Sequence, residues 1–447
     1  MGAFHAYDIR GIYNVDFDKN DVYKIGFYLP QLLKTNEILV GRDVRTSSPE
    51  IFEYLSKGIT DAGADVFNIG LATTPMVYFA TSKYNFKASV QITASHNGRE
   101  YNGLKVSREN ALPVGLDTGL GELQKIITTQ TPAPTGKKGE IKPLNAKDDY
   151  IAFLKKYLGN YDNLKIGMDL SNGMAALLIK DLLGSKPIYL YDDLDGTFPN
   201  HEANPLIPEN VVALKKLVTD NQCDVGVIFD GDADRVMFVD EKGNFVSPDL
   251  MIAVLGHYFL EGKNIKAKVL QDIRTSKAVG EYLQQFGVEM HTWRVGRAYA
   301  APKLREIDGL FGGELAGHFY FKDFFYSDSG MLACLIILDV IAQMKLKGIS
   351  LGELISKIGV YKNSGEINFK IEDKKAAIDA VCQYFTSTEN ATKIMDFDGY
   401  RIEFSDWWFN IRPSNTEPYL RFLAEAKTDE LLAEKVDKTK EILSRFM

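Results

Sequence analysis

One layout recurs three times along this chain of 447 residues: a short apolar strand, a polar turn, a helix and a second strand. The copies span residues 37–70, 165–191 and 268–293. We expect the helix of the first copy at roughly 49–62, and the helices of the second and third to end at Leu183 and Phe286. Each copy continues with another helix and another apolar strand. Strands and helices that alternate in this way are typical of open α/β sheets. The repeat therefore predicts three similar mixed α/β domains.

The last part of the chain departs from this layout. Alternating strands are expected at 366–371 and 400–404, and an amphipathic helix from about Asp429. This pattern predicts a smaller C-terminal α+β domain. Because the length exceeds what one hydrophobic core usually supports, we divide the chain into four domains. They span residues 1–146, 147–252, 253–362 and 363–447.

Charge and cysteine usage exclude several classes of protein. A formal net charge of −8 provides no positive field to hold nucleic acid or an anionic membrane surface. Cys223, Cys334 and Cys382 form no C-x-x-C pair, which fits a reducing cytosol better than a disulfide framework or a zinc site. The N-terminus has no signal-peptide pattern, and the most apolar stretch, 331–344, is too short for a membrane span and is expected to be a buried helix. We expect a cytoplasmic protein without nucleic-acid or membrane partners.

Each repeat ends in an apolar strand followed by an unusual polar run. The three junctions read ASVQI then TASHNG, DVGVIF then DGDADR, and GLFGG then ELAGH. Ligands of open α/β sheets bind beyond the carboxyl ends of the strands. Since the three runs occupy equivalent places in the repeats, we expect them to converge on one central cleft.

The second run has the composition of a cation site. Asp230, Asp232 and Asp234 place three carboxylates at alternate positions of a tight turn, with small residues between them. Mg²⁺ accepts carboxylates together with a phosphate oxygen. A solvated acidic turn is the alternative, and the preceding buried strand and the adjacent Arg235 count against it. An EF-hand is excluded because the later glutamate is missing.

The first run places Ser95 just past a strand, beside His96. Taken alone, such a serine is more often a turn residue than a functional one. The following YNGLK adds Lys105, a cation that can meet a phosphate or take part in proton transfer. Arg10, in YDIRG, comes similarly after a short N-terminal segment.

A last polar loop, RPSNTEP, is rich in hydrogen-bond donors. It combines the guanidinium of Arg412 with Ser414, Asn415 and Thr416, and Arg421 lies on the strand that follows. A planar guanidinium fork with further donors is a suitable phosphate cradle. The alternative is a turn with a solvated arginine.

Together these segments resemble a known family. YDIRG, TASHNG with YNGLK, DGDADR, GGELAGH and RPSNTEP, in this order, are similar to the motifs of the α-D-phosphohexomutase superfamily, closest to its phosphomannomutase/phosphoglucomutase branch. The resemblance covers essentially the whole chain. It implies four domains around a central cleft, and transfer of phosphate between the 1 and 6 positions of mannose or glucose through a phosphoserine and a hexose 1,6-bisphosphate.

The resemblance also assigns roles to residues. Ser95 would be the phosphoserine, and Mg²⁺ would be held by a phosphoserine oxygen together with Asp230, Asp232 and Asp234. Arg235 would steady the phosphate. Proton transfer and charge stabilisation would fall to Arg10, His96 and Lys105. Glu314 and His318 would hold sugar hydroxyls, and the phosphate that is not transferred would be bound by Arg412, Ser414, Asn415, Thr416 and Arg421.

Three residues depart from the family pattern. Ala316 stands where the usual GEMSGH has a serine that contacts substrate, Arg274 where many members carry lysine, and Arg297 where histidine is frequent. Arginine stays protonated, so we predict that Arg274 and Arg297 bind substrate phosphate instead of moving protons. For Arg297 the alternative is a cap or ion pair at the helix that begins near Ala298.

Other functions stay open at this point. A phosphoglucosamine mutase usually shows GEQSGH and RPSGTEP, whereas Leu315 and Asn415 favour the mannose/glucose branch. A metal-dependent phosphatase would admit water to the phosphoserine, and a non-catalytic sugar-phosphate-binding protein would need none of the catalytic groups. The expected partner is a small phosphosugar, and the chain is expected to be a monomer or a dimer.

Overall fold

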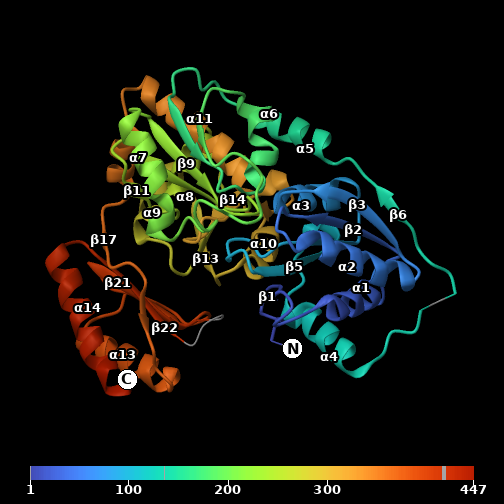
Figure 1. Ribbon diagram of the computed structural model, residues 1–447. Coiled ribbons are helices and arrows are strands. Elements are labelled where there is room, and N and C mark those ends of the chain that lie inside the picture. The colour runs from blue at the N-terminus through green and yellow to red at the C-terminus, as the bar shows by residue number, and fades with distance from the viewer. Residues whose placement is uncertain (1, 135, 415–418) are drawn as a thin grey trace.

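The computed structural model of the chain describes residues 2–134, 136–414 and 419–447. Four sheets follow one another along the chain. Figure 1 shows them as four units, the last of which is set to one side of the other three, with the tip of β21 and β22 directed toward the N-terminal unit. The described part of the chain contains no helix with the length and apolar character needed to cross a membrane.

The first unit is a sheet of strands in the order β1-β5-β4-β2-β3-β6, with helices around it. Its strands are β1 (Ile9–Ile12), β2 (Glu37–Arg42), β3 (Asp65–Leu71), β4 (Ala88–Ile92), β5 (Tyr101–Arg108) and β6 (Ile141–Pro143). Its helices are α1 (Lys19–Leu33), α2 (Ser48–Asp61), α3 (Thr74–Lys83) and α4 (Leu120–Thr129). In α2, Ile51, Leu55 and Ile59 recur every fourth residue and are buried, which gives the helix the apolar stripe that packs inward.

The second unit has the strand order β11-β10-β9-β7-β8. Its strands are β7 (Ile166–Asp169), β8 (Ile188–Leu190), β9 (Val225–Phe229), β10 (Val236–Asp240) and β11 (Phe245–Val246), and its helices are α5 (Lys147–Leu154), α6 (Ile179–Leu183) and α7 (Val212–Asp220). The strands β7 and β9 are buried along their whole length, as expected for strands covered on both faces.

The third unit has the strand order β13-β12-β14-β15-β16. Its strands are β12 (Lys268–Asp272), β13 (Glu289–Trp293), β14 (Phe311–Gly313), β15 (Phe319–Phe321) and β16 (Ser327–Asp328). Its helices are α8 (Leu250–Leu260), α9 (Lys277–Leu283), α10 (Arg297–Glu306), α11 (Gly330–Leu346) and α12 (Leu351–Ile358). The helix expected at 331–344 is therefore confirmed as α11, which is buried over most of its length.

These three sheets share one construction, which confirms the predicted similarity of the units. In each sheet, one strand lies between two partners. It pairs in parallel with an earlier strand on one side, and it pairs antiparallel with the next strand of the chain on the other side. These strands are β4, β9 and β14. The polar runs after Ile92, Phe229 and Gly313 are thus the connections between equivalent strand pairs.

The fourth unit differs because its strand pairs are all antiparallel among the described residues. Its strands are β17 (Lys362–Asn363), β18 (Ile367–Phe369), β19 (Lys393–Met395), β20 (Tyr400–Glu403), β21 (Trp407–Pro413) and β22 (Leu420–Ala426). Two helices, α13 (Lys374–Thr388) and α14 (Asp429–Leu443), cover it. The expected C-terminal α+β unit is confirmed.

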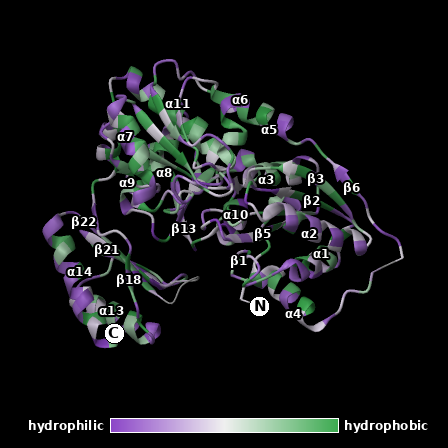
Figure 2. Ribbon diagram, viewed as in Figure 1, coloured by the Kyte–Doolittle hydropathy of each residue, from purple (hydrophilic) through white to green (hydrophobic). Residues whose placement is uncertain are grey.

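The hydrophobic cores explain which units hold together. One large core combines residues from the first three units, including Phe79, Tyr150 and Phe324. The fourth unit has a core of its own around Phe385, Trp407 and Phe409. Figure 2 shows α8 mainly in the colour of hydrophobic residues, whereas α14 at the edge of the molecule carries both hydrophilic and hydrophobic residues. The predicted boundary at residue 252 falls inside α8, a helix that packs on α11 of the third unit.

Candidate active site

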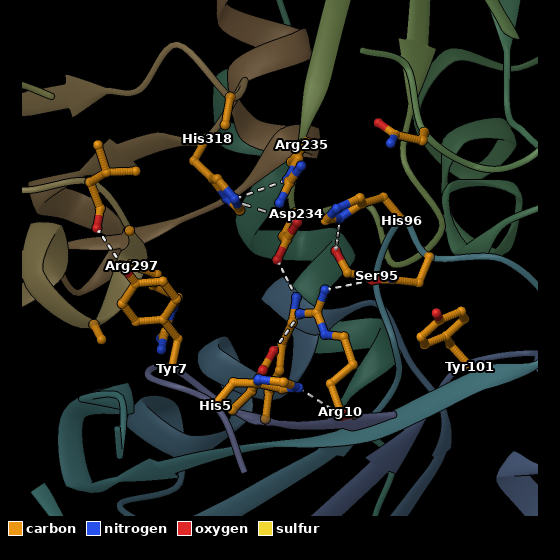
Figure 3. A pocket seen from close by; sticks show the side chains of 18 of the residues that line it. His5, Tyr7, Arg10, Ser95, His96, Tyr101, Asp234, Arg235, Arg297 and His318 are labelled. Atoms are coloured by element: carbon orange, nitrogen blue, oxygen red, sulfur yellow. Dashed lines mark hydrogen bonds and ion pairs between the residues drawn. The ribbon is translucent and has the colours of Figure 1, made fainter. Parts of the chain in front are cut away.

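A cavity of about 860 Å³ lies where the four units meet. Figure 3 shows several of its side chains, among them Arg10, Ser95, His96, Asp234, Arg235 and His318, directed toward one another. Most of the predicted site residues line it: Arg10, Ser95, His96, Lys105, Asp234, Arg235, Arg274, Arg297, Glu314, Ala316, His318, Arg412, Ser414 and Arg421. Asp230 and Asp232 lie buried beneath its wall, whereas Asn415 and Thr416 fall outside the described residues.

Ser95 occupies a strained position in the connection after β4. Its φ of 54° lies in the left-handed region, which is uncommon for a residue with a side chain. Its backbone N–H donates to Thr93 Oγ1 at 2.9 Å, and its hydroxyl donates to Asp230 Oδ2 at 3.0 Å. The hydroxyl oxygen is also 3.4 Å from His96 Nδ1. The loop therefore presents the serine oxygen to a carboxylate and an imidazole.

Arg45, which the sequence patterns did not single out, holds this loop in place. It is buried, and its guanidinium donates to the carbonyls of Ser95 at 2.8 Å, Asn97 at 2.7 Å, Gly98 at 2.6 Å and Tyr101 at 3.0 Å. Its Nε donates to a carboxylate of the same β2–α2 loop at 3.1 Å. Five donors in a planar fork are matched to five acceptors. The GRDVRTSS segment follows a strand as the other site loops do, and that position is the signal that could have pointed to it.

The three aspartates form a cluster suited to a divalent cation. Asp230, Asp232 and Asp234 are buried, and each offers a carboxylate oxygen within 4.8 Å of the others. Asp232 Oδ1 and Asp234 Oδ1 accept no hydrogen bond from any described residue. Buried carboxylate oxygens are costly to leave unpaired. The residues therefore fit Mg²⁺, which prefers such oxygen ligands.

Lys105 pairs with the remaining oxygens of this cluster. Its Nζ lies 2.7 Å from Asp232 Oδ2 and 2.6 Å from Asp234 Oδ2, and Thr74 also donates to Asp232. Burial alone would lower the pKa of Lys105, but the two carboxylates raise it above its ordinary value. Burial, with the carboxylates of Asp234 and Asp232, raises the pKa of Asp230 well above its usual range. In this arrangement Lys105 is a fixed cation.

His96 has the opposite electrostatic environment. Burial, with the nearby cations Arg235 and Arg10, lowers the pKa of His96 well below its ordinary value. The ring is therefore neutral near pH 7, as a proton acceptor must be. Arg10, on β1, forms an ion pair with Asp8 and donates to Asn97 Oδ1 at 2.8 Å. Of the predicted proton-transfer groups, only His96 is uncharged.

The connection after β14 brings Glu314, Ala316 and His318 to the cavity. Both carboxylate oxygens of Glu314 accept hydrogen bonds within the protein. Oε1 accepts one from Tyr320 Oη at 2.6 Å, and Oε2 accepts one from the Gly296 N–H at 3.2 Å. Ala316 offers no polar side-chain group. His318 Nε2 accepts from Arg235 Nε at 2.9 Å.

A group of arginines lies on the side of the cavity formed by the third and fourth units. Arg274 pairs with Asp272 at 2.8 Å, and Arg421 with Glu366 at 3.0 Å. Arg412 is buried, and its Nε and Nη1 make no hydrogen bond among the described residues. Burial, together with the positive charge of Arg274, lowers the pKa of Arg412. Two neighbouring guanidinium groups in one wall suit an anion such as phosphate.

Arg297 is the first residue of α10. Its Nε donates to Asp328 Oδ1 at 2.9 Å, its Nη2 donates to the Ala111 carbonyl at 2.7 Å, and its guanidinium lies 3.6 Å from the centre of the Tyr78 ring. Arg297 thus forms an ion pair, as the alternative expected, but with a carboxylate of β16 and not of its own helix, and it still lines the cavity. Its assignment to substrate binding stays a prediction.

Phosphoryl transfer requires mainly positioning and cationic stabilisation of the transferred group. The cavity supplies a serine hydroxyl, a carboxylate cluster suited to Mg²⁺, a neutral histidine and several fixed cations, contributed by four units of the fold. Fold and site together define an enzyme of phosphoryl transfer.

Comparison with known proteins gives the family. The chain matches the phosphoglucomutase/phosphomannomutase α/β/α domains I, II and III over residues 1–133, 148–243 and 247–361, and the C-terminal domain over 366–442. A phosphomannomutase of Salmonella montevideo is 36% identical over 99% of this chain and 98% of that protein, and one of Methanocaldococcus jannaschii is 35% identical with the same coverage. The crystal structure of a phosphoglucomutase/phosphomannomutase family protein from Burkholderia thailandensis gives a TM-score of 0.89 at 27% identity, covering 99% of this chain and 97% of that one. The chain belongs to the phosphoglucomutase/phosphomannomutase family.

Proposed function

We propose that this enzyme interconverts hexose 1-phosphate and hexose 6-phosphate, with mannose or glucose as the sugar, through a phosphoserine at Ser95 and a hexose 1,6-bisphosphate. One observation carries the proposal: Ser95 and the arginines Arg274 and Arg412 line the same cavity. A phosphate can thus be transferred at the serine while another is held by the arginines. The relatives named phosphomannomutase support mannose as one of the sugars.

The proposed reaction has two transfers. In the first, the bond between phosphorus and Ser95 Oγ breaks while a bond to the oxygen of the free sugar hydroxyl forms; the hydroxyl loses its proton and Ser95 Oγ takes one up. The bisphosphate then turns over in the cavity. In the second, Ser95 Oγ attacks the other phosphoryl group, its proton passes to a base, and the sugar oxygen that leaves takes up a proton. The neutral His96 is the group we propose for the Ser95 proton, because its Nδ1 is 3.4 Å from Ser95 Oγ.

The cationic groups have supporting roles in this scheme. Asp230, Asp232 and Asp234 would hold Mg²⁺, which when bound supplies charge neutralisation for a phosphate on Ser95. Lys105 stays protonated between two of these carboxylates and stabilises developing negative charge. Because the bisphosphate is both intermediate and phosphate donor, we propose that glucose 1,6-bisphosphate activates the unphosphorylated enzyme. A cytoplasmic monomer or dimer stays our expectation.

The variant Ser95→Ala tests the phosphoryl carrier. It should lower kcat by roughly 10³-fold or more, because the atom that accepts the phosphoryl group is missing. Mannose 1-phosphate and glucose 1-phosphate are assayed in parallel, with glucose 1,6-bisphosphate as activator and with release of inorganic phosphate recorded. The matched control is Ser82→Ala, since Ser82 Oγ is buried without a hydrogen-bond partner among the described residues.

Four outcomes would contradict the proposal. Substantial turnover by Ser95→Ala, or a stable phosphate found by intact mass on another residue of the active enzyme, would rule out Ser95 as carrier. Stoichiometric phosphate release without isomerisation would indicate a phosphatase. Tight binding of hexose phosphate with no turnover would indicate a non-catalytic binding protein.

The carboxylate cluster is tested by Asp232→Asn. Replacing one anionic ligand with an amide should weaken Mg²⁺ binding by about tenfold or more. Chelation should abolish wild-type activity reversibly, and Mg²⁺ should raise the thermal midpoint of the wild type more than that of the variant. Full activity of chelated Asp232→Asn enzyme would contradict a magnesium site here.

A further inference from the structure

A series of contacts leads from Arg297 of the third unit through the second unit to Ser95 of the first. The Arg297 guanidinium is fixed in three ways, by Asp328 of the third unit, by the Ala111 carbonyl of the first and by the ring of Tyr78, which is buried in the first. An arginine stacked on an aromatic ring and paired at its edge is held rigidly. These contacts leave the guanidinium well placed to act on Asp328.

Asp328 transmits this contact to His318. The carboxylate is fully buried, and its second oxygen, Oδ2, lies 2.7 Å from His318 Nδ1. On the other side of the ring, His318 Nε2 lies 2.9 Å from Arg235 Nε. A guanidinium can only donate, so Nε2 must carry the lone pair and Nδ1 the hydrogen. Asp328 accepts the hydrogen bond from Nδ1 and thereby selects the tautomer of His318 whose Nε2 can accept a hydrogen bond from Arg235.

Arg235 completes the path to the serine. Its backbone N–H donates to Asp230 Oδ1 at 3.2 Å, and its Nε is 3.8 Å from Asp230 Oδ2. Asp230 Oδ2 is the atom that accepts from Ser95 Oγ. Figure 3 shows Arg235 between His318 and the Ser95 region. The orientation of Arg235 therefore depends on its hydrogen bond to His318 Nε2, which is an acceptor because Asp328 fixes the tautomer of the ring.

We infer that Arg297 is a positioning residue for phosphoryl transfer, and that it acts through Asp328 and His318 to orient Arg235 beside Ser95. Without Arg297, Asp328 Oδ1 would be a buried, unpaired carboxylate oxygen, and the carboxylate would turn or take up a proton to compensate. Either change frees His318 from its single tautomer. The inference rests on the proposed function only for its kinetic consequence.

A double-mutant cycle tests whether Arg297 works through Asp328. Arg297→Met and Asp328→Asn should each lower kcat by about tenfold or more while KM stays within about threefold, since transition-state positioning is lost and ground-state binding is kept. The double variant should be no slower than the slower single variant, because both substitutions break the same path. Multiplication of the two effects would overturn the inference.

Arg305→Met is the matched control for the interface between the first and third units. Arg305 lies on the same helix and donates to the neighbouring Asn110 carbonyl at 3.2 Å and to the Phe325 carbonyl at 2.8 Å, but no hydrogen bond joins it to Asp328 or His318, both of which the structure describes. Its loss should lower the thermal midpoint and leave kcat within about twofold. Equal kinetic losses in Arg305→Met and Arg297→Met would show a merely structural role and overturn the inference.

The tautomer of His318 gives a readout that needs no turnover. The chain has only 6 histidines, so ring ¹⁵N spectra can be assigned by substitution. The wild type should show His318 with its hydrogen on Nδ1. In Asp328→Asn the amide can donate to Nδ1, which moves the hydrogen to Nε2, and in Arg297→Met the two tautomers should mix. An unchanged Nδ1–H tautomer in both variants would overturn the inference.

The outcomes separate the inference from the proposed function. If the wild type converts no hexose phosphate, the proposed function is wrong. The ring ¹⁵N spectra still decide whether Arg297 and Asp328 fix the tautomer of His318. If Arg297→Met raises KM strongly with kcat unchanged, and Asp328→Asn has no effect, Arg297 binds phosphate directly and the positioning role is wrong. If Arg297→Met does not fold, Asp328→Asn alone must show both the slower kcat and the reversed tautomer.

Discussion

At the scale of single residues, the serine loop depends on a side chain that does no chemistry. Arg45 donates to four carbonyls of the loop that holds Ser95 at a positive φ. Arg45→Lys keeps the charge but has only three donors, which cannot reach four carbonyls and a carboxylate. We expect kcat to fall by about tenfold or more and the free energy of unfolding to fall by about 1–3 kcal/mol. Steady-state kinetics and urea unfolding measure both.

The control for this variant is a half-buried arginine of α10. Arg305→Lys alters a guanidinium that donates to the carbonyls of Asn110 at 3.2 Å and Phe325 at 2.8 Å, neither of which belongs to the serine loop. After incubation with glucose 1,6-bisphosphate, intact mass should show less phosphoserine in Arg45→Lys than in wild type, and the same amount in Arg305→Lys. Equal phosphorylation of all three proteins would mean that Arg45 does not position Ser95.

At the scale of elements, the loop between β8 and α7 forms part of the cavity wall. Glu202, Asn204 and Leu206 of this loop line the cavity. The neighbouring His201 lies 3.1 Å from Asp169 Oδ2 through Nε2 and 2.7 Å from the Glu202 carbonyl through Nδ1. Both partners are acceptors, so both ring nitrogens pair best when they carry hydrogen. Burial lowers the pKa of His201, but the hydrogen bond to Asp169, the charge of that carboxylate and the Glu202 carbonyl together raise the pKa above its ordinary value.

His201 should therefore stabilise this loop more in mildly acidic solution than in alkaline solution. A pKa that is higher in the folded state gives stability that is complete below the unfolded value of about 6.5 and is lost as the pH rises through the folded value. His201→Gln should cost about 1–2 kcal/mol of unfolding free energy at pH 5.5 and less at pH 8.5. Urea unfolding at the two pH values measures the difference. An equal cost at both would show that the protonated ring is not the stabilising form.

At the scale of the whole molecule, the fourth unit is joined to the third beside a predicted phosphate ligand. Arg401 of β20 is buried, stacks 3.7 Å from the Trp408 ring and binds the carbonyls on either side of Arg274. The unit also carries Arg412. Correct placement of the two arginines therefore depends on this junction.

Arg401→Met should loosen the junction. We propose that Arg274 and Arg412 hold the phosphate that is not being transferred, in the ground state and in the transition state alike. We therefore expect KM to rise by about tenfold and kcat to fall less. Kinetics with mannose 1-phosphate and glucose 1-phosphate measure the two constants. The fourth unit keeps its own core, so its unfolding should persist as a cooperative step. A fall in kcat with unchanged KM would contradict this account.

Local sequence patterns are enough to predict the elements and the site loops. Hydrophobic periodicity is a local property, so helices such as α2 and α11 and the strands that precede the polar runs could be predicted from neighbouring residues alone. Ser95 and the aspartates could be singled out because their residue types sit together at strand ends. The boundary predicted at residue 252 falls inside α8, because an apolar helix has the same sequence pattern whichever unit it packs on.

Which residues act together depends on contacts between distant parts of the chain. Arg45 contacts carbonyls 50 to 56 positions away, and Arg297 reaches a carbonyl 186 positions away. Buried polar groups need hydrogen-bond partners, and any group of suitable chemistry can be one. The local sequence does not specify which of these groups folding brings near. The charge states of Lys105 and His96 follow from the same cause, because they depend on carboxylates and cations that other units contribute.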